Sequence, residues 1–238
     1  MKRVSRTSLL VITLMLTTLT ARAALVWDTA NNTATDSRVI VFDTPGTATI
    51  NDLLQFNSAA AVTAGEAAGS YVLTSVVLTI TGSEMSGRFQ FNNTLGLPAT
   101  VYSANFAAGQ GLTFSAAGAS VVQTMTHAFN GGNPYNMVSG ESYTENFAPT
   151  LAAAGSSTVT TGLAAFTGNG FLASSSANLS AQMSSSQDAG IFAGSFASGT
   201  ATFSLTYHYA PVPEPTALAL LGLGCAALGL RRRRTANV

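Results

Sequence analysis

Two histidines are the first residues to consider for chemistry, because imidazole is the side chain that most often acts as a general base near neutral pH. Neither His127 nor His208 lies at metal-ligand spacing from the other or beside the single cysteine. A hydrolytic triad is defined by geometry, so a distant serine and carboxylate could still join one of them. The chain has no G-x-S-x-G, H-E-x-x-H or Walker-type motif. The sequence therefore favours a protein that is not an enzyme, with a secreted hydrolase as the least favoured alternative.

Oxygen-bearing side chains are concentrated in the stretch DTANNTATD, from Asp28 to Asp36, which raises the question of a calcium site. The stretch lacks the D-x-D-x-D-G spacing of an EF-hand-like loop, and Asn and Asp also close turns through their own backbone. We therefore expect a polar turn here, and neither a metal nor a cofactor.

Aromatic side chains suggest another kind of site, because an aromatic ring combines an apolar face with a specific geometry for packing. If Tyr102, Tyr135 or Tyr143 lies exposed on a concave sheet face, the body is a carbohydrate-binding module. This is the main alternative to a structural or adhesive protein.

The elements that would position these residues are predicted to be strands. In ATFSLTYHYA, Phe203, Leu205, Tyr207 and Tyr209 fall on one face and alternate with polar residues, which is the pattern of a half-buried strand. Many such short strands, separated by Gly, Asn and Pro, predict an all-β fold. We expect an antiparallel β-sandwich of jelly-roll or immunoglobulin-like type, with an open barrel as the runner-up.

Two local predictions concern the middle of the body. SYVLTSVVLTITG and GRFQFNN, with Phe89 and Phe91 on one side of the second, are predicted to form a hairpin joined through GSEMSG. The stretch INDLLQFNSAAAVTAGEAA is predicted to hold a short helical turn.

Charge is unevenly distributed along the chain. Residues 24–212 contain two arginines, no lysine and nine acidic residues, a net charge of −7, whereas the other basic residues lie near the two ends. Nucleic-acid binding needs clustered Lys and Arg, so this composition argues against nucleic acid as a partner.

The N-terminus has the three parts of a secretory signal peptide. MKRVSR is basic, LLVITLML is apolar, and Ala21 and Ala23 supply the small residues of an A-x-A cleavage site. We expect cleavage between Ala23 and Ala24. Residues 1–23 are then a signal helix that is removed, and 24–212 form the exported body.

The C-terminus ends in an uncharged segment and a cluster of arginines. Thr216–Leu230 is apolar and would be about 22 Å long as a helix, against a hydrocarbon core of about 30 Å, so bilayer thinning or snorkelling must close the gap. Arg231, Arg232, Arg233 and Arg234 cannot cross the bilayer, and they are predicted to keep the C-terminus cytoplasmic as a stop-transfer signal. We expect Cys225 to be a small apolar residue of this transmembrane helix.

The order of these parts, Val-Pro-Glu-Pro, apolar run and arginine cluster, closely resembles the PEP-CTERM sorting signal over residues 213–238. The resemblance implies that Pro213, Glu214 and Pro215 are recognised by an exosortase, a membrane-embedded cysteine transpeptidase. It also implies a Gram-negative bacterium that secretes exopolysaccharide, and a transient inner-membrane anchor before the protein reaches the cell surface or extracellular matrix.

The body resembles the choice-of-anchor E domain over roughly residues 45–210. The stretches that carry the resemblance are LLQFN, GSYVLTSVVLTITGSEMSGRFQFNNT, LAAFTGNGFLAS and GTATFSLTYHYAPVPEP, the last of which continues to Pro215. Members of that family share a β-rich body and differ in their anchoring signal, and the resemblance brings no catalytic residue. We therefore expect an exported, exosortase-processed surface protein with a structural or adhesive role, and exopolysaccharide as a candidate partner.

Overall fold

A computed structural model describes residues 24–67, 69–153, 155–213 and 223 of the chain. The helical elements are short: α1(Ser58–Thr63), η1(Phe129–Gly132) and η2(Leu163–Phe166). The strands are β1(Val26–Asp28), β2(Thr33–Phe42), β3(Gly46–Thr49), β4(Tyr71–Asn93), β5(Ala99–Phe106), β6(Gly111–Ala116), β7(Ala119–Thr126), β8(Tyr135–Met137), β9(Ser142–Phe147), β10(Thr150–Leu151), β11(Ser156–Val159), β12(Ser175–Ser180), β13(Met183–Gln187) and β14(Ile191–Pro211).

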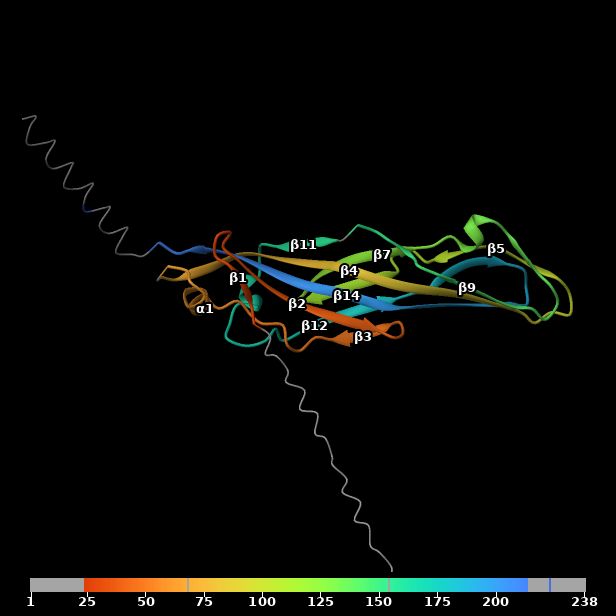
Figure 1. Ribbon diagram of the computed structural model, residues 1–238, viewed down its shortest axis with the longest axis horizontal. Coiled ribbons are helices and arrows are strands. Elements are labelled where there is room, and N and C mark those ends of the chain that lie inside the picture. Colours follow the sequence, from red (N-terminus) through yellow and green to blue (C-terminus); the bar gives the residue numbers. More distant parts are fainter. Residues whose placement is uncertain (1–23, 68, 154, 214–222, 224–238) are drawn as a thin grey trace, which may run out of the picture.

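The strands form three antiparallel sheets that pack as two layers (Figure 1). One layer is a sheet in the order β1-β2-β14-β4-β11, with β9 also paired to β4. The other layer consists of the sheets β10-β7-β6-β12-β3 and β13-β5-β8. Rings meet across the layers, as Phe203 does with Phe114 at 5.6 Å between centroids and Phe89 with Phe106 at 5.2 Å. The predicted all-β antiparallel class is confirmed, and the described strands close no barrel.

Strands β4 and β14 run the length of the elongated body and hold its two ends together. They have 23 and 21 residues and pair from Ile191 opposite Asn93 to Pro211 opposite Tyr71. We call the end near Tyr71 and Pro211 the proximal end, where α1 and β1 lie, and the end near Asn93 the distal end, where β5 and β9 lie (Figure 1).

The predicted hairpin through GSEMSG is wrong, because this segment lies inside the continuous strand β4. Pairing with β14 shifts between Thr200 and Thr202, where β4 carries an extra residue, and Gly82 there has a φ of 57°. Glycine adopts this left-handed conformation without the penalty of a side chain, so it serves a β-bulge as readily as a turn. A second register shift lies between His208 and Tyr209.

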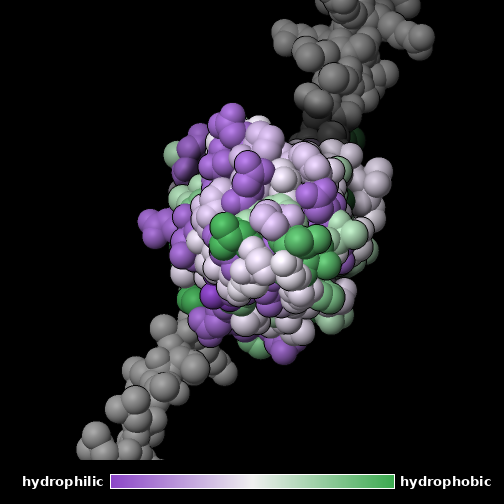
Figure 2. Space-filling model, turned by 90° about the vertical axis from the view of Figure 1, so that its right-hand side faces the viewer, coloured by the Kyte–Doolittle hydropathy of each residue, from purple (hydrophilic) through white to green (hydrophobic). Residues whose placement is uncertain are grey.

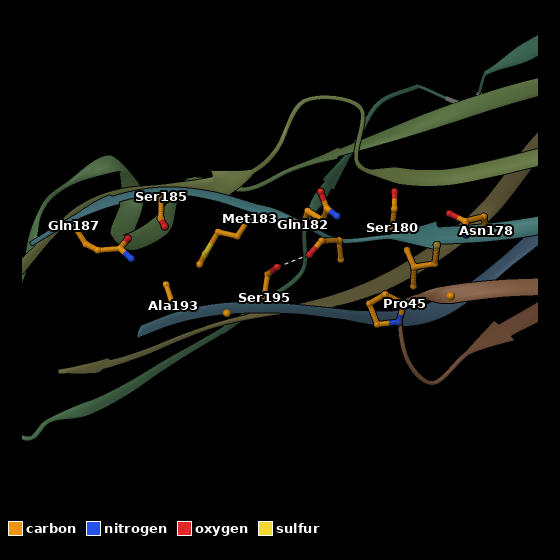
Figure 3. Close-up of a pocket in the computed structure, with 13 residues that line it drawn as sticks. Pro45, Asn178, Ser180, Gln182, Met183, Ser185, Gln187, Ala193 and Ser195 are labelled. Carbon is orange, nitrogen blue, oxygen red and sulfur yellow. Dashed lines mark hydrogen bonds between the residues drawn. The ribbon is translucent and has the colours of Figure 1, made fainter. Parts of the chain in front are cut away.

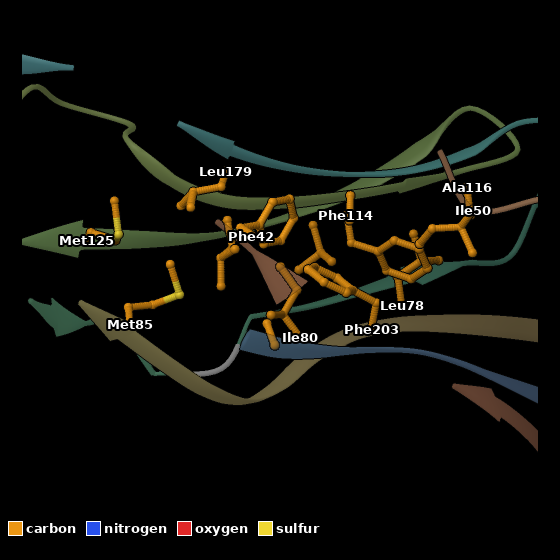
Figure 4. Packing of buried hydrophobic residues seen from close by; sticks show 14 of the residues in the cluster. Phe42, Ile50, Leu78, Ile80, Met85, Phe114, Ala116, Met125, Leu179 and Phe203 are labelled. Atoms are coloured by element: carbon orange, nitrogen blue, oxygen red, sulfur yellow. The ribbon is translucent and has the colours of Figure 1, made fainter. Parts of the chain in front are cut away.

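The core lies between the layers, where large apolar side chains from both face one another (Figure 4). Ile80 and Leu78 of β4 and Phe203 of β14 are fully buried against Phe114 of β6 and Phe42 at the end of β2. Each such side chain stabilises the fold by about 1.5–3 kcal/mol relative to its exposed state.

Two further predictions are confirmed. Phe203, Leu205, Tyr207 and Tyr209 are all buried on the inner face of β14. The short helical turn is α1, which Asn57 caps by accepting a hydrogen bond from the N–H of Ala59 at 2.9 Å.

The distal tip exposes apolar side chains among hydrophilic ones, as the end-on view shows (Figure 2). Buried Asn93 organises this tip, because its side-chain amide donates to the carbonyl oxygens of Leu97 and Val138, both at 2.9 Å. Leu97 is 69% exposed and Val138 is 63% exposed. The tip is therefore held by polar contacts while its apolar side chains face solvent.

Candidate functional site

The sorting motif begins where the folded body ends. β14 ends at Pro211, and the N–H of Val212 still donates to the carbonyl oxygen of Ser70 at 2.8 Å. Pro213 is described, whereas Glu214, Pro215 and Arg231–Arg234 lie outside the described residues, as does Ala23 of the expected cleavage site. The predicted signal helix and the apolar run also lie outside them, apart from Leu223. Within the described ranges, no helix has the length and apolarity that a membrane span requires.

His127 is part of a polar cluster that fixes the loop between β7 and β8. Its Nε2 lies 2.8 Å from Oε1 of Glu145, and its ring stacks on Phe147 with centroids 3.5 Å apart. The other oxygen of Glu145 accepts the N–H of Asn130 at 3.0 Å. No hydrogen bond joins His127 to a serine within the described part of the chain. In this part of the chain, His127 therefore has the carboxylate partner of a catalytic triad, Glu145, but no serine nucleophile.

His208 lies on the outward side of β14, as the alternation predicts, opposite Thr33 of β2 and Ser75 of β4. The two histidines are thus on different faces and do not form one site.

The stretch Asp28–Asp36 is divided between two environments. Asp28 accepts hydrogen bonds from the backbone and side chain of Asn31 in the β1–β2 turn, which confirms the predicted polar turn. Asp36 is buried, binds Arg38, and accepts the N–H of Leu54 at 2.8 Å. The structure therefore does not bring these carboxylates together.

The three tyrosines considered for sugar binding do not share a face. Tyr135 and Tyr143 are half-buried and pack on each other with centroids 4.2 Å apart. The Tyr135 hydroxyl donates to Glu141 at 2.7 Å, and this bond, with burial next, raises the pKa of Tyr135 to about 12. Tyr102 is 49% exposed, and its hydroxyl donates to Asp188 at 2.9 Å, which raises the Tyr102 pKa. These tyrosines therefore make contacts within the protein and do not form a shared surface on which a sugar could pack.

The aromatic surface that the sequence did not reveal lies on the outer face of β9, β4 and β14 at the distal end. We call it the distal platform, and register places its residues in rows. These rows are Phe192–Asn92–Ser142, Gly194–Gln90–Thr144 and Phe196–Arg88–Asn146. Phe192 is 70% exposed, although a phenylalanine beside an isoleucine in a β-rich sequence is more typical of a core.

A hollow of about 310 Å³ opens on the distal platform. Its lining includes Phe192, Gly194, Gln90, Asn92, Ser142 and Thr144. The amides and hydroxyls can both donate and accept hydrogen bonds, and the hollow contains no charged side chain. The arrangement can hold a neutral polar group beside an aromatic ring.

Arg88 borders this hollow at the next row of the platform. Its guanidinium carbon lies 5.1 Å from the centroid of the Phe196 ring, within the range of a cation–π contact. The other arginine of the body, Arg38, is bound by Asp36 and Asp52, whereas Arg88 forms no ion pair with any described residue.

A second, larger hollow of about 730 Å³ lies on the opposite side of β14, where the layers separate (Figure 3). Ser185 and Gln187 of β13 face Ala193 and Ser195 of β14 across it, and the Ser195 hydroxyl donates to the carbonyl oxygen of Ala181. This edge groove exists because β2 pairs with β14 only from Gly199 onwards. Its lining is uncharged and lacks an aromatic ring.

Residues 211–234 match a family described as the "PEP-CTERM protein-sorting motif". This confirms the resemblance of the tail, and a motif of this kind marks an exported protein targeted to an exosortase, with transient membrane anchoring in Gram-negative bacteria. This match does not extend over the body, so the resemblance to choice-of-anchor E stays a prediction.

No curated protein matches the sequence. Among solved structures, a chain of the "Structure of infectious bursal disease virus Gt strain" is similar at 11% sequence identity and a TM-score of 0.17. The match covers 84% of this chain and 50% of the viral one, so the present chain spans half of its length. A TM-score this low does not indicate a common fold.

Proposed function

We propose that this protein is a non-enzymatic component of the cell surface or extracellular matrix, with a structural or adhesive role, released by an exosortase. The observation that carries the proposal is the match of residues 211–234 to the sorting motif, directly at the end of β14. Proteins with this motif are sorted by their tail, so the body is the part that acts at the destination.

The parts of the tail have separate roles in this proposal. Pro213, Glu214 and Pro215 are the recognition motif, and Thr216–Leu230 is a temporary span of the inner membrane. The four arginines fix its cytoplasmic end, because Lys and Arg resist translocation. The N-terminal signal, cleaved between Ala23 and Ala24, starts the export.

The chemistry of the body suits a structural or adhesive role in a hydrated layer. Its net charge of −7 over residues 24–212 opposes self-association, and its outward strand positions are rich in Ser and Thr. Among the described residues, His127 and the carboxylates discussed above fix loops, and none of them is hydrogen-bonded to a serine. These features support a body that works through its surface.

Replacing Glu214 with Ala tests the proposal in cells that contain the exosortase. We expect a membrane-retained precursor that keeps its arginine tail, because the central residue of the recognition motif is lost. The measurements are cell fractionation and the intact mass of the protein. Asp43→Ala, which removes an exposed acid of the body, is the matched control and should be released normally.

Deleting the exosortase should retain the unmodified protein in the membrane in the same way. Normal release of Glu214→Ala, or an arginine tail that stays attached with and without the exosortase, would contradict the proposed sorting.

A further inference from the structure

The distal platform has the shape and spacing of a linear binding site. Phe192, Gly194 and Phe196 point outwards from one strand, and alternate residues of a strand are about 6.8 Å apart. The Cα atoms of the two phenylalanines therefore lie about 14 Å apart with the open position of Gly194 between them. Asn92, Gln90 and Arg88 follow the same direction on β4.

The position of Gly194 keeps the centre of the site open. A Cβ atom built there would meet no atom within 4 Å, and its backbone is not in the left-handed region. The glycine is therefore not required by a turn or by close packing of the backbone. A side chain at this position would project into the hollow without straining the fold.

The groups around the hollow point to a saccharide as ligand. A sugar ring has apolar C–H faces and hydroxyl edges, so it can pack on exposed Phe192 while Gln90, Asn92, Ser142 and Thr144 exchange hydrogen bonds with its hydroxyls. A peptide in extended form would instead pair with a free strand edge, and the open edge of β14 before Gly199 borders the edge groove, not the outer face that carries Phe192 and Gln90.

Arg88 indicates that the ligand carries a negative charge. It is a cation without an ion-pair partner among the described residues, in a body that is otherwise strongly acidic. A guanidinium group binds a carboxylate or a sulfate through paired hydrogen bonds, and stacking on Phe196 holds it in place.

We infer that the distal platform binds an extended acidic polysaccharide, with Phe192 packing on a sugar ring, the hollow at Gly194 holding the hydroxyl groups of a neighbouring ring and Arg88 pairing with an acidic substituent. This inference rests on the proposed function, since it names the partner of a surface or matrix protein. The site lies at the distal end, so it stays exposed while the proximal end is tethered to the membrane.

The test uses the full-length chain purified in detergent, so that its outcome does not depend on sorting in cells. Isothermal titration with oligogalacturonate, alginate and hyaluronan should detect binding of at least one of them, and dextran should bind more weakly. Binding to none of the three acidic saccharides would overturn the inference. Equal binding of dextran, or equal competition by polyglutamate, would overturn the assignment to an acidic saccharide.

Three variants locate the site. Phe192→Ala should weaken binding about tenfold. Arg88→Gln should weaken it about fivefold and remove the preference over dextran. Gly194→Leu should abolish binding by filling the hollow.

The matched controls are Phe171→Ala, which removes another exposed ring, and Gly96→Leu, which adds a side chain where a Cβ would also meet nothing within 4 Å. Both should bind like the parent protein. If the controls and the site variants lose binding equally, or if none loses it, the platform is not the site.

Discussion

Strand β14 places its aromatic residues differently at its two ends. At the proximal end, Tyr209 packs on Phe56 at 5.3 Å and on Trp27 at 5.6 Å, and its ring is buried. At the distal end, the same strand turns Phe192 and Phe196 outwards. An aromatic residue on this strand therefore belongs to the core or to the surface according to its position, and its residue type does not decide between them.

The difference follows from two features of the pairing. β2 covers the second edge of β14 from Gly199 to His208, and it brings the loop with Phe56 over the proximal end. The alternation of β14 is unbroken, because both bulges insert their extra residue in β4. Odd-numbered positions of β14 such as Tyr209 therefore face inwards along its whole length, and even-numbered ones such as Phe192 and Phe196 face outwards. The distal half of β14 lacks the cover of β2 and presents its outer face to solvent.

The largest expected effect comes from comparing two phenylalanines of β14. Phe203→Ala removes a fully buried ring between Phe42 and Phe114 and should lower the free energy of unfolding by about 3–5 kcal/mol. Phe192→Ala removes an exposed ring and should change it by less than about 0.5 kcal/mol. Urea denaturation followed by circular dichroism measures both. Similar losses for the two variants would show that the ends are not packed differently.

An intermediate effect is expected from two glycines of the same strand. Gly199 marks the boundary between the ends; its φ is 154°, and a Cβ there would collide with the backbone of Glu84 and Met85. Gly199→Ala should therefore cost about 1–3 kcal/mol of stability. Gly194→Ala should be neutral or stabilise by up to about 1 kcal/mol, because it meets no atom and reduces the freedom of the unfolded chain. Thermal unfolding of both variants distinguishes a required glycine from an open one.

The smallest effect concerns alkaline pH. Burial, with the charge of Asp36 next, raises the pKa of Tyr207, and burial with the hydrogen bond to Glu66 raises that of Tyr209. Both ionise at about pH 10 in the unfolded chain, so the unfolded state loses protons first. Their contribution to stability is complete below about pH 10 and is lost as the pH rises above it.

Distal Tyr135, with its pKa raised to about 12, should lose its contribution only between about pH 10 and 12. Urea midpoints measured from pH 8 to pH 11 should fall less steeply in Tyr209→Phe than in the parent protein. An unchanged slope would mean that Tyr209 is not protected from ionisation at the proximal end.

The sequence predicted the elements well wherever side chains alternate without interruption. Phe203 to Tyr209 follow a period of two, so the buried face of β14 could be assigned correctly. The predicted hairpin around Gly82 was wrong, because a glycine with positive φ occurs in both turns and β-bulges. Only the pairing with β14 shows that Gly82 belongs to a bulge. The beginning of β14 is a second example. The strand starts at Ile191, in the stretch IFAGSFASG, where apolar and polar residues alternate only weakly and pairing with β4 extends the strand.

The distal platform could not have been predicted from the sequence. Its members come from β9, β4 and β14 and meet only through the register of these strands. Tyr102, Tyr135 and Tyr143 were reasonable candidates by type, but Asp188 and Glu141 bind two of their hydroxyls, and Tyr143 packs on Tyr135. The sorting motif of the tail could be predicted because it is a linear order of residues, which can be recognised without knowing the fold.

The continuity of β14 has a mechanical consequence. The strand connects Phe192 on the distal platform to Pro211, where the chain leaves the body, over a length of about 60 Å. A force that enters at Phe192 reaches this exit along one covalent segment. A force that enters through Gln90 or Asn92 of β4 reaches it through the hydrogen bonds between β4 and β14, which are loaded in parallel, as shear along the strands. Breaking such a pair requires many bonds to yield together, whereas peeling would break them one after another. The fold thus resists tension along its long axis, the direction in which an attached surface protein is pulled.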